Sequence, residues 1–137
     1  MDDREQQLCD VIKEQLQNQY RHMAEIARMT QEMKEAFDRN DKISGEMILD
    51  MRGEEMEQYD QYRHNLETLF LSMNEIEERE IKRLLEGETD IQLWPERIEE
   101  LKNLVLRIRY NREKARKLDQ AISLRLAGND SFYHIEK

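Results

Sequence analysis

The sequence predicts an all-α fold, namely an elongated antiparallel three-helix bundle or coiled coil with a long helical hairpin. Three observations lead to this prediction. The 137 residues, enough for a single domain, include 39% charged residues but only four glycines and one proline, which is typical of long helices. Apolar residues recur every three or four positions over long segments. A short polar turn, DRND at 38–41, makes the second helix fold back on the first.

The first helix is predicted over about residues 3–38. Asp2 or Asp3 is expected to cap it, with Glu5 or Gln6 placed to return a hydrogen bond to the cap. Its apolar residues form one stripe at helical spacing: Leu8, Ile12, Leu16, Tyr20, Met23, Ile26, Ala27, Thr30, Met33 and Phe37.

The second helix is predicted over about residues 41–86, with Asp41 as its N-cap and Gly87 as its stop. An uninterrupted helix of this length would measure roughly 65 Å, which makes the molecule a rod. Its main stripe is expected to contain Ile43, Met47, Met51, Tyr59, Tyr62, Leu66, Leu69, Phe70, Met73, Ile76 and Leu84.

The third helix is predicted over about residues 95–127, with Pro95 at its first position. Gly128 is expected to end it, which leaves residues 128–137 as a C-terminal tail. The spacing of its apolar residues is close to a heptad seam. This seam contains Ile98, Leu101, Val105, Ile108, Ala115, Ile122 and Leu126.

The charge distribution argues against nucleic-acid binding, because the chain has a net charge of -9. Residues 54–90 form an acidic block and residues 107–117 a basic block. We expect the two blocks to face each other across the seam, although each exposed ion pair contributes only about 0–1 kcal/mol. An anionic ligand on the basic block is the alternative. Arg112 and Asp119 occupy seam positions and can pair with one another.

No motif in the sequence predicts a catalytic residue, a cofactor or a metal site. QYRH occurs at 19–22 and 61–64, with glutamine where the carboxylate of a di-iron site would be. Phosphate-binding loops, serine elbows and zinc spacings are absent from the sequence. An enzyme is therefore the weakest hypothesis, with Arg112 as its one candidate residue. A single cysteine, no secretory signal and no long apolar run predict a cytoplasmic protein without a membrane span.

A second strip on the second helix is the first candidate partner-binding site. It lies about 100° or more around the helix from the stripe of Ile43, Met47 and Met51. Glycine inside a helix costs about 1 kcal/mol relative to alanine, so two glycines here suggest close approach or softness. The strip is either covered by the chain itself, or receives an amphipathic helix of a partner, or mediates self-association. It consists of Gly45, Leu49, Gly53 and Met56.

The C-terminal segment is the second candidate. Phe132, Tyr133 and Ile135 form a small apolar cluster among polar residues. We expect this cluster either to fold back on the bundle or to bind a partner.

Two segments carry a resemblance to a known family. RNDKISGEMILDMRGEEM at 39–56 and LDQAISLRLAGNDSFY at 118–133, within an acidic helical hairpin, resemble the flagellar-type export chaperones, the FlgN/FliT-like group. The resemblance implies a non-enzymatic bacterial cytoplasmic chaperone. Such proteins hold a helical terminal segment of a flagellar axial subunit, either hook–filament junction or filament cap, before protein export.

The resemblance also implies that substrate binding involves the C-terminal region, at about Leu118 to Ile135. The residues expected to take part are Leu118, Ile122, Leu126, Phe132, Tyr133 and Ile135. The alternative function is a structural or adaptor coiled-coil homodimer with no export role.

Overall fold

The computed structural model describes the backbone of residues 1–136 and the side chains of residues 1–128. The described chain is helical, without strands, so the predicted all-α bundle is confirmed. Its elements are α1 (Asp3–Asp38), α2 (Lys42–Thr68), the short 3₁₀ helix η1 (Leu69–Ser72), α3 (Glu75–Leu85) and α4 (Ile98–Glu136).

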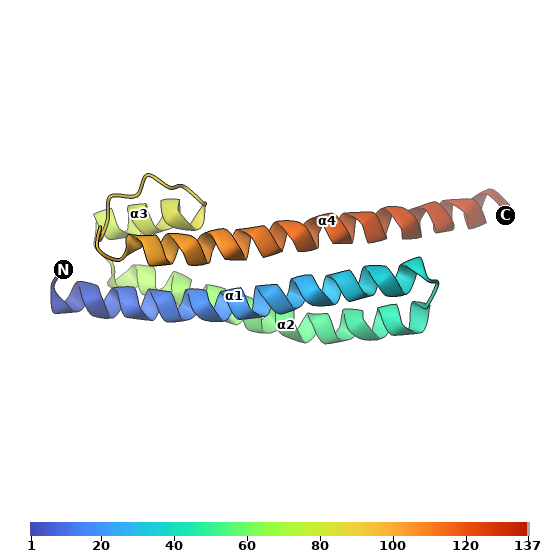
Figure 1. Cartoon of the computed structure of the whole chain (residues 1–137), viewed down its shortest axis with the longest axis horizontal. Helices are drawn as coiled ribbons and strands as arrows, with labels where there is room; N and C mark the ends of the chain where they lie inside the picture. Colours follow the sequence, from blue (N-terminus) through green and yellow to red (C-terminus); the bar gives the residue numbers. More distant parts are fainter. Residues whose placement is uncertain (137) are drawn as a thin grey trace.

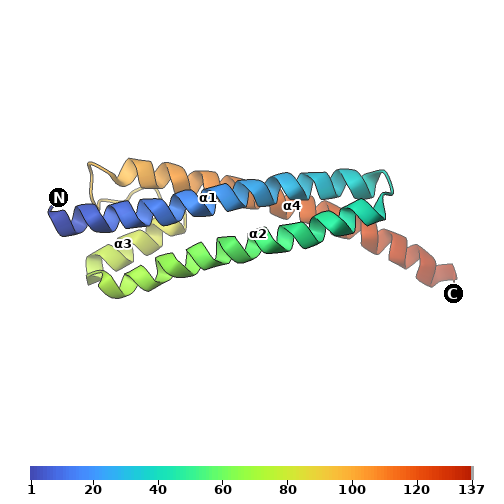
Figure 2. The same cartoon turned by 90° about the horizontal axis from the view of Figure 1, so that it is seen from below.

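The helices form a long rod in which α1 contacts both α2 and α4 (Figures 1 and 2). Helix α2 is antiparallel to α1. Helix α4 is parallel to α1, because Arg97 pairs with Asp10 near the start of both helices and Arg125 pairs with Asp38 further along. Helix α3 is short and lies beside the first part of α4. Beyond the end of α3 the rod consists of α1, α2 and α4, and α4 continues past the turn that joins α1 and α2.

Helix α1 begins and ends where the sequence predicts. Asp2 is its N-cap, and a capping box joins Asp2 to Glu5. Its buried residues lie on two sides of the helix, because α2 and α4 both pack on it. The fully buried ones include Cys9, Ile12, Leu16, Thr30 and Ala36.

The predicted continuous helix over 41–86 is wrong, because the chain reverses after η1. Met73 is extended, with φ -98° and ψ 150°. Asn74 then caps α3, and its side chain and that of Glu77 form a reciprocal capping box. This capping box is readable in the sequence as NEIE at 74–77, and it starts a new helix where apolar periodicity alone suggests continuity.

A part-buried ion pair holds the start of α3 against α1. Arg4 donates to both carboxylate oxygens of Glu77, at 3.0 and 2.8 Å, and also to the Ser72 carbonyl. The Glu77 side chain is only 3% exposed. Its hydrogen bonds from Arg4 hold the pKa of the Glu77 carboxyl below its usual value. Ile81 and Leu84 are the buried apolar anchors of α3.

The end of α3 is set by Gly87, as predicted, with a φ of +92°. A Cβ at Gly87 would lie 2.7 Å from Nε of Arg109, so α4 also approaches closely here. Helix α4 begins three residues after Pro95, which lies in the preceding turn. The backbone N–H groups of Arg97 and Ile98 both donate to the Trp94 carbonyl.

Helix α4 does not end at Gly128. Its backbone stays helical to Glu136, so the predicted tail over 128–137 is instead mostly a continuation of the helix. Nothing lies within 4 Å of a Cβ built at Gly128. The cost of one glycine in a helix, about 1 kcal/mol, is therefore not enough to stop it here.

The side of α2 that faces α1 agrees with the predicted stripe at Tyr59 and Leu66 but differs from it in the first half of the helix. Its buried residues follow heptad spacing: Gly45, Arg52, Tyr59 and Leu66. Ile43, Met47 and Met51, predicted to be core, are 77%, 59% and 49% exposed. The reason is the ring of Phe37, which lies 2.6 Å from a Cβ placed on Gly45. Only glycine lets the Phe37 ring pack here, and this contact rotates the apolar residues outward.

Gly45 and Gly53 give a matched test of this packing. Gly45→Ala is expected to lower the free energy of unfolding by about 1–2 kcal/mol, because overpacking outweighs the gain in helix propensity. Gly53→Ala has nothing within 4 Å of the new Cβ and is expected to raise it by about 0.5–1 kcal/mol. Urea unfolding followed by circular dichroism measures both. Equal stabilisation by the two substitutions would contradict the role of Phe37.

Candidate partner-binding groove

An open groove runs between α2 and α4, with α1 as its floor. We call it the α2–α4 groove. It begins where α3 ends at Leu85, and it consists of two compartments that share Tyr59 and Arg112. On α4 it extends from Val105 to Asp119, which corresponds to roughly 20 Å of helix.

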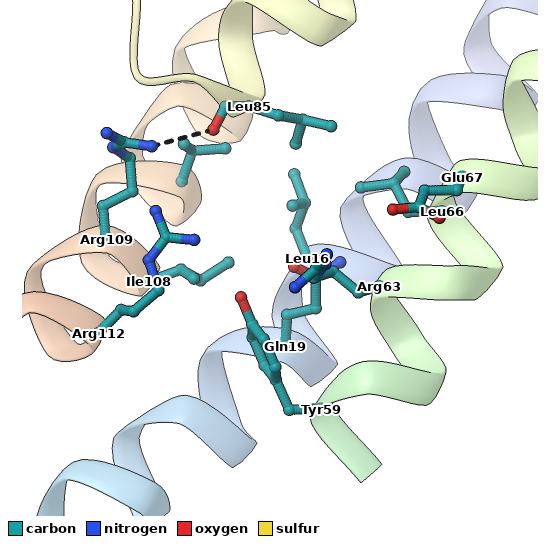
Figure 3. A pocket seen from close by; sticks show the side chains of 11 residues that line it. Leu16, Gln19, Tyr59, Arg63, Leu66, Glu67, Leu85, Ile108, Arg109 and Arg112 are labelled. Carbon is teal, nitrogen blue, oxygen red and sulfur yellow. Dashed lines mark hydrogen bonds between the residues drawn. The ribbon is translucent and has the colours of Figure 1, made fainter. Parts of the chain in front are cut away.

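The first compartment, next to the end of α3, has a cavity volume of about 290 Å³ (Figure 3). Its floor includes Leu16 and Gln19 of α1. Its walls carry Arg63 on α2 and Ile108 on α4, together with the shared Tyr59 and Arg112. This volume is at the lower end of the range for small-molecule sites, about 300–1,000 Å³.

The second compartment, further from α3, has a cavity volume of about 310 Å³ and presents apolar side chains from all three helices. Met23 and Ile26 form the floor, Met56 lies on the α2 wall, and Ala115 lies on the α4 wall. Met56 is 37% exposed. An apolar side chain from a partner would therefore find both a floor and two walls here.

A polar bridge across the bundle closes the far end of the groove. Nη1 of Arg52 on α2 donates to Thr30 Oγ1 on α1 at 3.0 Å and to Asp119 Oδ1 on α4 at 2.7 Å. The Arg52 side chain is only 9% exposed. Asp119 thus pairs with Arg52, and the predicted pairing with Arg112 is wrong.

The first compartment has an excess of positive charge. Three guanidinium groups line it, from Arg63, Arg109 and Arg112, against the single carboxylate of Glu67. Arg109 donates to the Leu85 carbonyl. Among the side chains of residues 1–128, Arg63 and Arg112 have no ion-pair or hydrogen-bond partner, and Figure 3 shows both guanidinium groups turned toward the cavity.

The predicted pairing of the acidic and basic blocks is therefore also wrong. Within the described side chains, no ion pair joins residues 54–90 to residues 107–117. Arg116, for example, pairs with Glu113 on its own helix. The reason is geometric, since the open groove separates the walls that carry the two blocks.

The four residues of the predicted strip on α2 lie in four different environments. Met56 lines the α2–α4 groove. Gly45 is buried under Phe37, and Gly53 is half-buried with free space above it. Leu49 is 44% exposed. Only Met56 belongs to the groove.

The predicted residues of the C-terminal region are also divided. Ile122 is buried in a small core with Met33 and Phe37. Leu118 is half-buried and Leu126 is 39% exposed. The other three predicted residues lie outside the described side chains: Phe132, Tyr133 and Ile135.

The reactive side chains of Cys9 and His22 lie outside the α2–α4 groove. Cys9 is fully buried, and burial raises the pKa of its thiol. His22 Nδ1 lies 2.6 Å from Glu55 Oε2, and the His22 ring stacks on Tyr62. The described side chains include no cluster of three or more His, Cys, Asp or Glu that could hold a metal ion.

The groove residues that sequence reasoning missed are Arg63 and Arg109. Tyr59 belongs to the predicted main stripe of the second helix, and it lies on the inner side as predicted. In the described part of the chain, no helix has the length and apolar character needed to cross a membrane. The chain matches no protein-family model, no curated protein and no solved structure.

Proposed function

We propose that the protein is a non-enzymatic helix-binding chaperone, and that the α2–α4 groove holds an amphipathic helix of its partner. The observation that supports this proposal is the incomplete fourth position of the bundle. Helix α3 occupies that position only as far as Leu85, and beyond it the apolar floor and walls continue without a covering helix. A partner helix there would complete a four-helix bundle.

The proposed partner is a helical segment of a flagellar axial subunit held before export. This part of the proposal rests on the resemblance of residues 39–56 and 118–133 to flagellar-type export chaperones. The α2–α4 groove supports this proposal because it can accommodate a helical segment.

The test is capture of partner proteins from cytoplasmic extract by the tagged chain, with identification by mass spectrometry. Met56→Glu puts a carboxylate among the apolar side chains of the groove and is expected to reduce capture of a flagellar subunit by about tenfold or more. Met47→Glu, on the exposed outer side of α2 at 59% exposure, is the matched control and should capture normally.

Three results would contradict the proposal. Equal capture by the Met56→Glu and wild-type chains would exclude the groove, and loss of capture with Met47→Glu would move the site to the outer side of α2. A tight dimer by light scattering at low micromolar concentration, dissociated by Met56→Glu, would support the homodimer alternative. Deletion of residues 129–137 in the same assay tests the predicted role of the C-terminal segment, which would be excluded by unchanged capture.

A further inference from the structure

The two compartments of the α2–α4 groove differ in charge, and the difference bears on which helices fit. The second compartment is lined by the carboxylates of Asp60 and Asp119 as well as by the guanidinium groups of Arg112 and Arg116, so its lining charges balance in number. In the first, three guanidinium groups face only Glu67. This positive excess lies in a chain whose net charge is -9, so the positive charge is local to this part of the groove.

Arg63 and Arg112 are the two groups best placed to receive a ligand. They come from opposite walls, and neither has a partner among the side chains of residues 1–128. Arg109 is partly engaged, because it donates to the Leu85 carbonyl. The arginine fork is suited to carboxylates, which accept two parallel hydrogen bonds from it.

Helix α3 illustrates what the fourth position of this bundle accepts. It combines two buried apolar anchors, Ile81 and Leu84, with two buried carboxylates, Glu77 and Glu80. Glu77 forms an ion pair with Arg4 of α1, and Glu80 forms one with Arg83 of α3 itself. The same position therefore already holds an amphipathic helix whose carboxylates are partly buried against arginines.

We propose that the first compartment receives a carboxylate side chain of the partner helix between Arg63 and Arg112, while the second receives an apolar side chain of the same helix. This inference rests on the proposed function, because it assumes that a helix occupies the groove. It adds that the protein selects acidic amphipathic helices over neutral or basic ones.

Three synthetic helical peptides of about 14–18 residues, long enough for a 20 Å groove at 1.5 Å per residue, test the proposal. They share one apolar face and carry Glu, Gln or Lys at the flanking positions, and their helicity is checked by circular dichroism. With the wild-type chain, fluorescence anisotropy is expected to show the Glu peptide binding about tenfold more tightly than the Gln peptide. Added salt is expected to reduce this preference.

Variants of the chain identify the groups responsible. The double variant Arg63→Gln with Arg112→Gln is expected to bind the Glu and Gln peptides equally. The matched control is Arg107→Gln, which changes an exposed arginine of α4 that stands over the Tyr20 ring outside the α2–α4 groove. This control should keep the wild-type preference for the Glu peptide.

The possible failures are distinguishable. Equal binding of all three peptides to the wild-type chain, abolished by Met56→Glu, would overturn the charge selection and leave the helix-binding function intact. No binding of any peptide would count against the helix-binding function itself. Binding of glutarate, used as a small dicarboxylate probe, without binding of the Glu peptide would overturn both and assign the arginines to a small anion.

Discussion

Replacing Ile81 with alanine is expected to lower the free energy of unfolding by about 3–4 kcal/mol. Ile81 is fully buried, and it is one of only two buried apolar anchors on the 11-residue helix α3. Large-to-small substitutions at such positions lose the transfer free energy of the side chain and leave a cavity, at a typical cost of about 2–5 kcal/mol. Urea unfolding followed by circular dichroism measures the effect.

Ile76→Ala is the matched control, because it makes the same chemical change on the same helix. Ile76 is 58% exposed, so its loss is expected to change stability by less than about 0.5 kcal/mol. Similar effects at the two positions would contradict the way in which α3 is docked. A large effect at Ile81 alone would show that this face of α3 is essential to the bundle.

The second large effect is expected at the polar bridge. Arg52→Ala should lower the free energy of unfolding by about 2–3 kcal/mol. Removing one partner of a buried ion pair typically costs about 3–5 kcal/mol, but Asp119 is 41% exposed and water can solvate it after the change. The buried Nε of Arg52 already lacks a partner, which further limits what the native side chain contributes.

Two further variants separate the causes of this effect. Arg52→Met keeps most of the side-chain volume and should lose less stability than Arg52→Ala. Arg63→Ala, an arginine truncation at an exposed position on the same helix, should change stability by less than about 0.5 kcal/mol. If Arg52→Ala proves as mild as Arg63→Ala, the bridge has no structural role.

Much of the fold could be predicted from the sequence because its signals are local. The cap at Asp2, the turn at 38–41 and the stop at Gly87 each depend on a few neighbouring residues, and the structure confirms all three. The break before α3 was also readable from the capping box at 74–77. Apolar spacing on both sides of the break predicts one helix instead, because it does not register the cap.

The orientation of α2 could not be read in the same way. Its inner seam includes Gly45 and Arg52, which apolar periodicity does not count as core residues. Gly45 is core because Phe37 packs on it, and Arg52 is core because Thr30 and Asp119 receive its guanidinium group. Both reasons lie on other helices, so they depend on tertiary packing.

The groove was predicted only in part for the same reason. Met56 was identified as a candidate, but as a member of a strip whose other residues lie elsewhere. The first compartment brings together side chains from α1, α2 and α4 at the end of α3. The position of this compartment depends on where α3 ends in space. A prediction of one continuous helix over 41–86 has no separate α3, so it could not locate the compartment.

The central place of α1 has a consequence for the order in which the chain is synthesised. Its partner α2 follows immediately, but its contacts with α4 join residues about 90 positions apart, such as Lys13 and Glu100. During translation the hairpin of α1 and α2 can therefore form while the side of α1 that packs on α4 is still uncovered. That uncovered side is the part of the nascent chain most exposed to aggregation, and its protection depends on α4, which is synthesised only after α2 and α3.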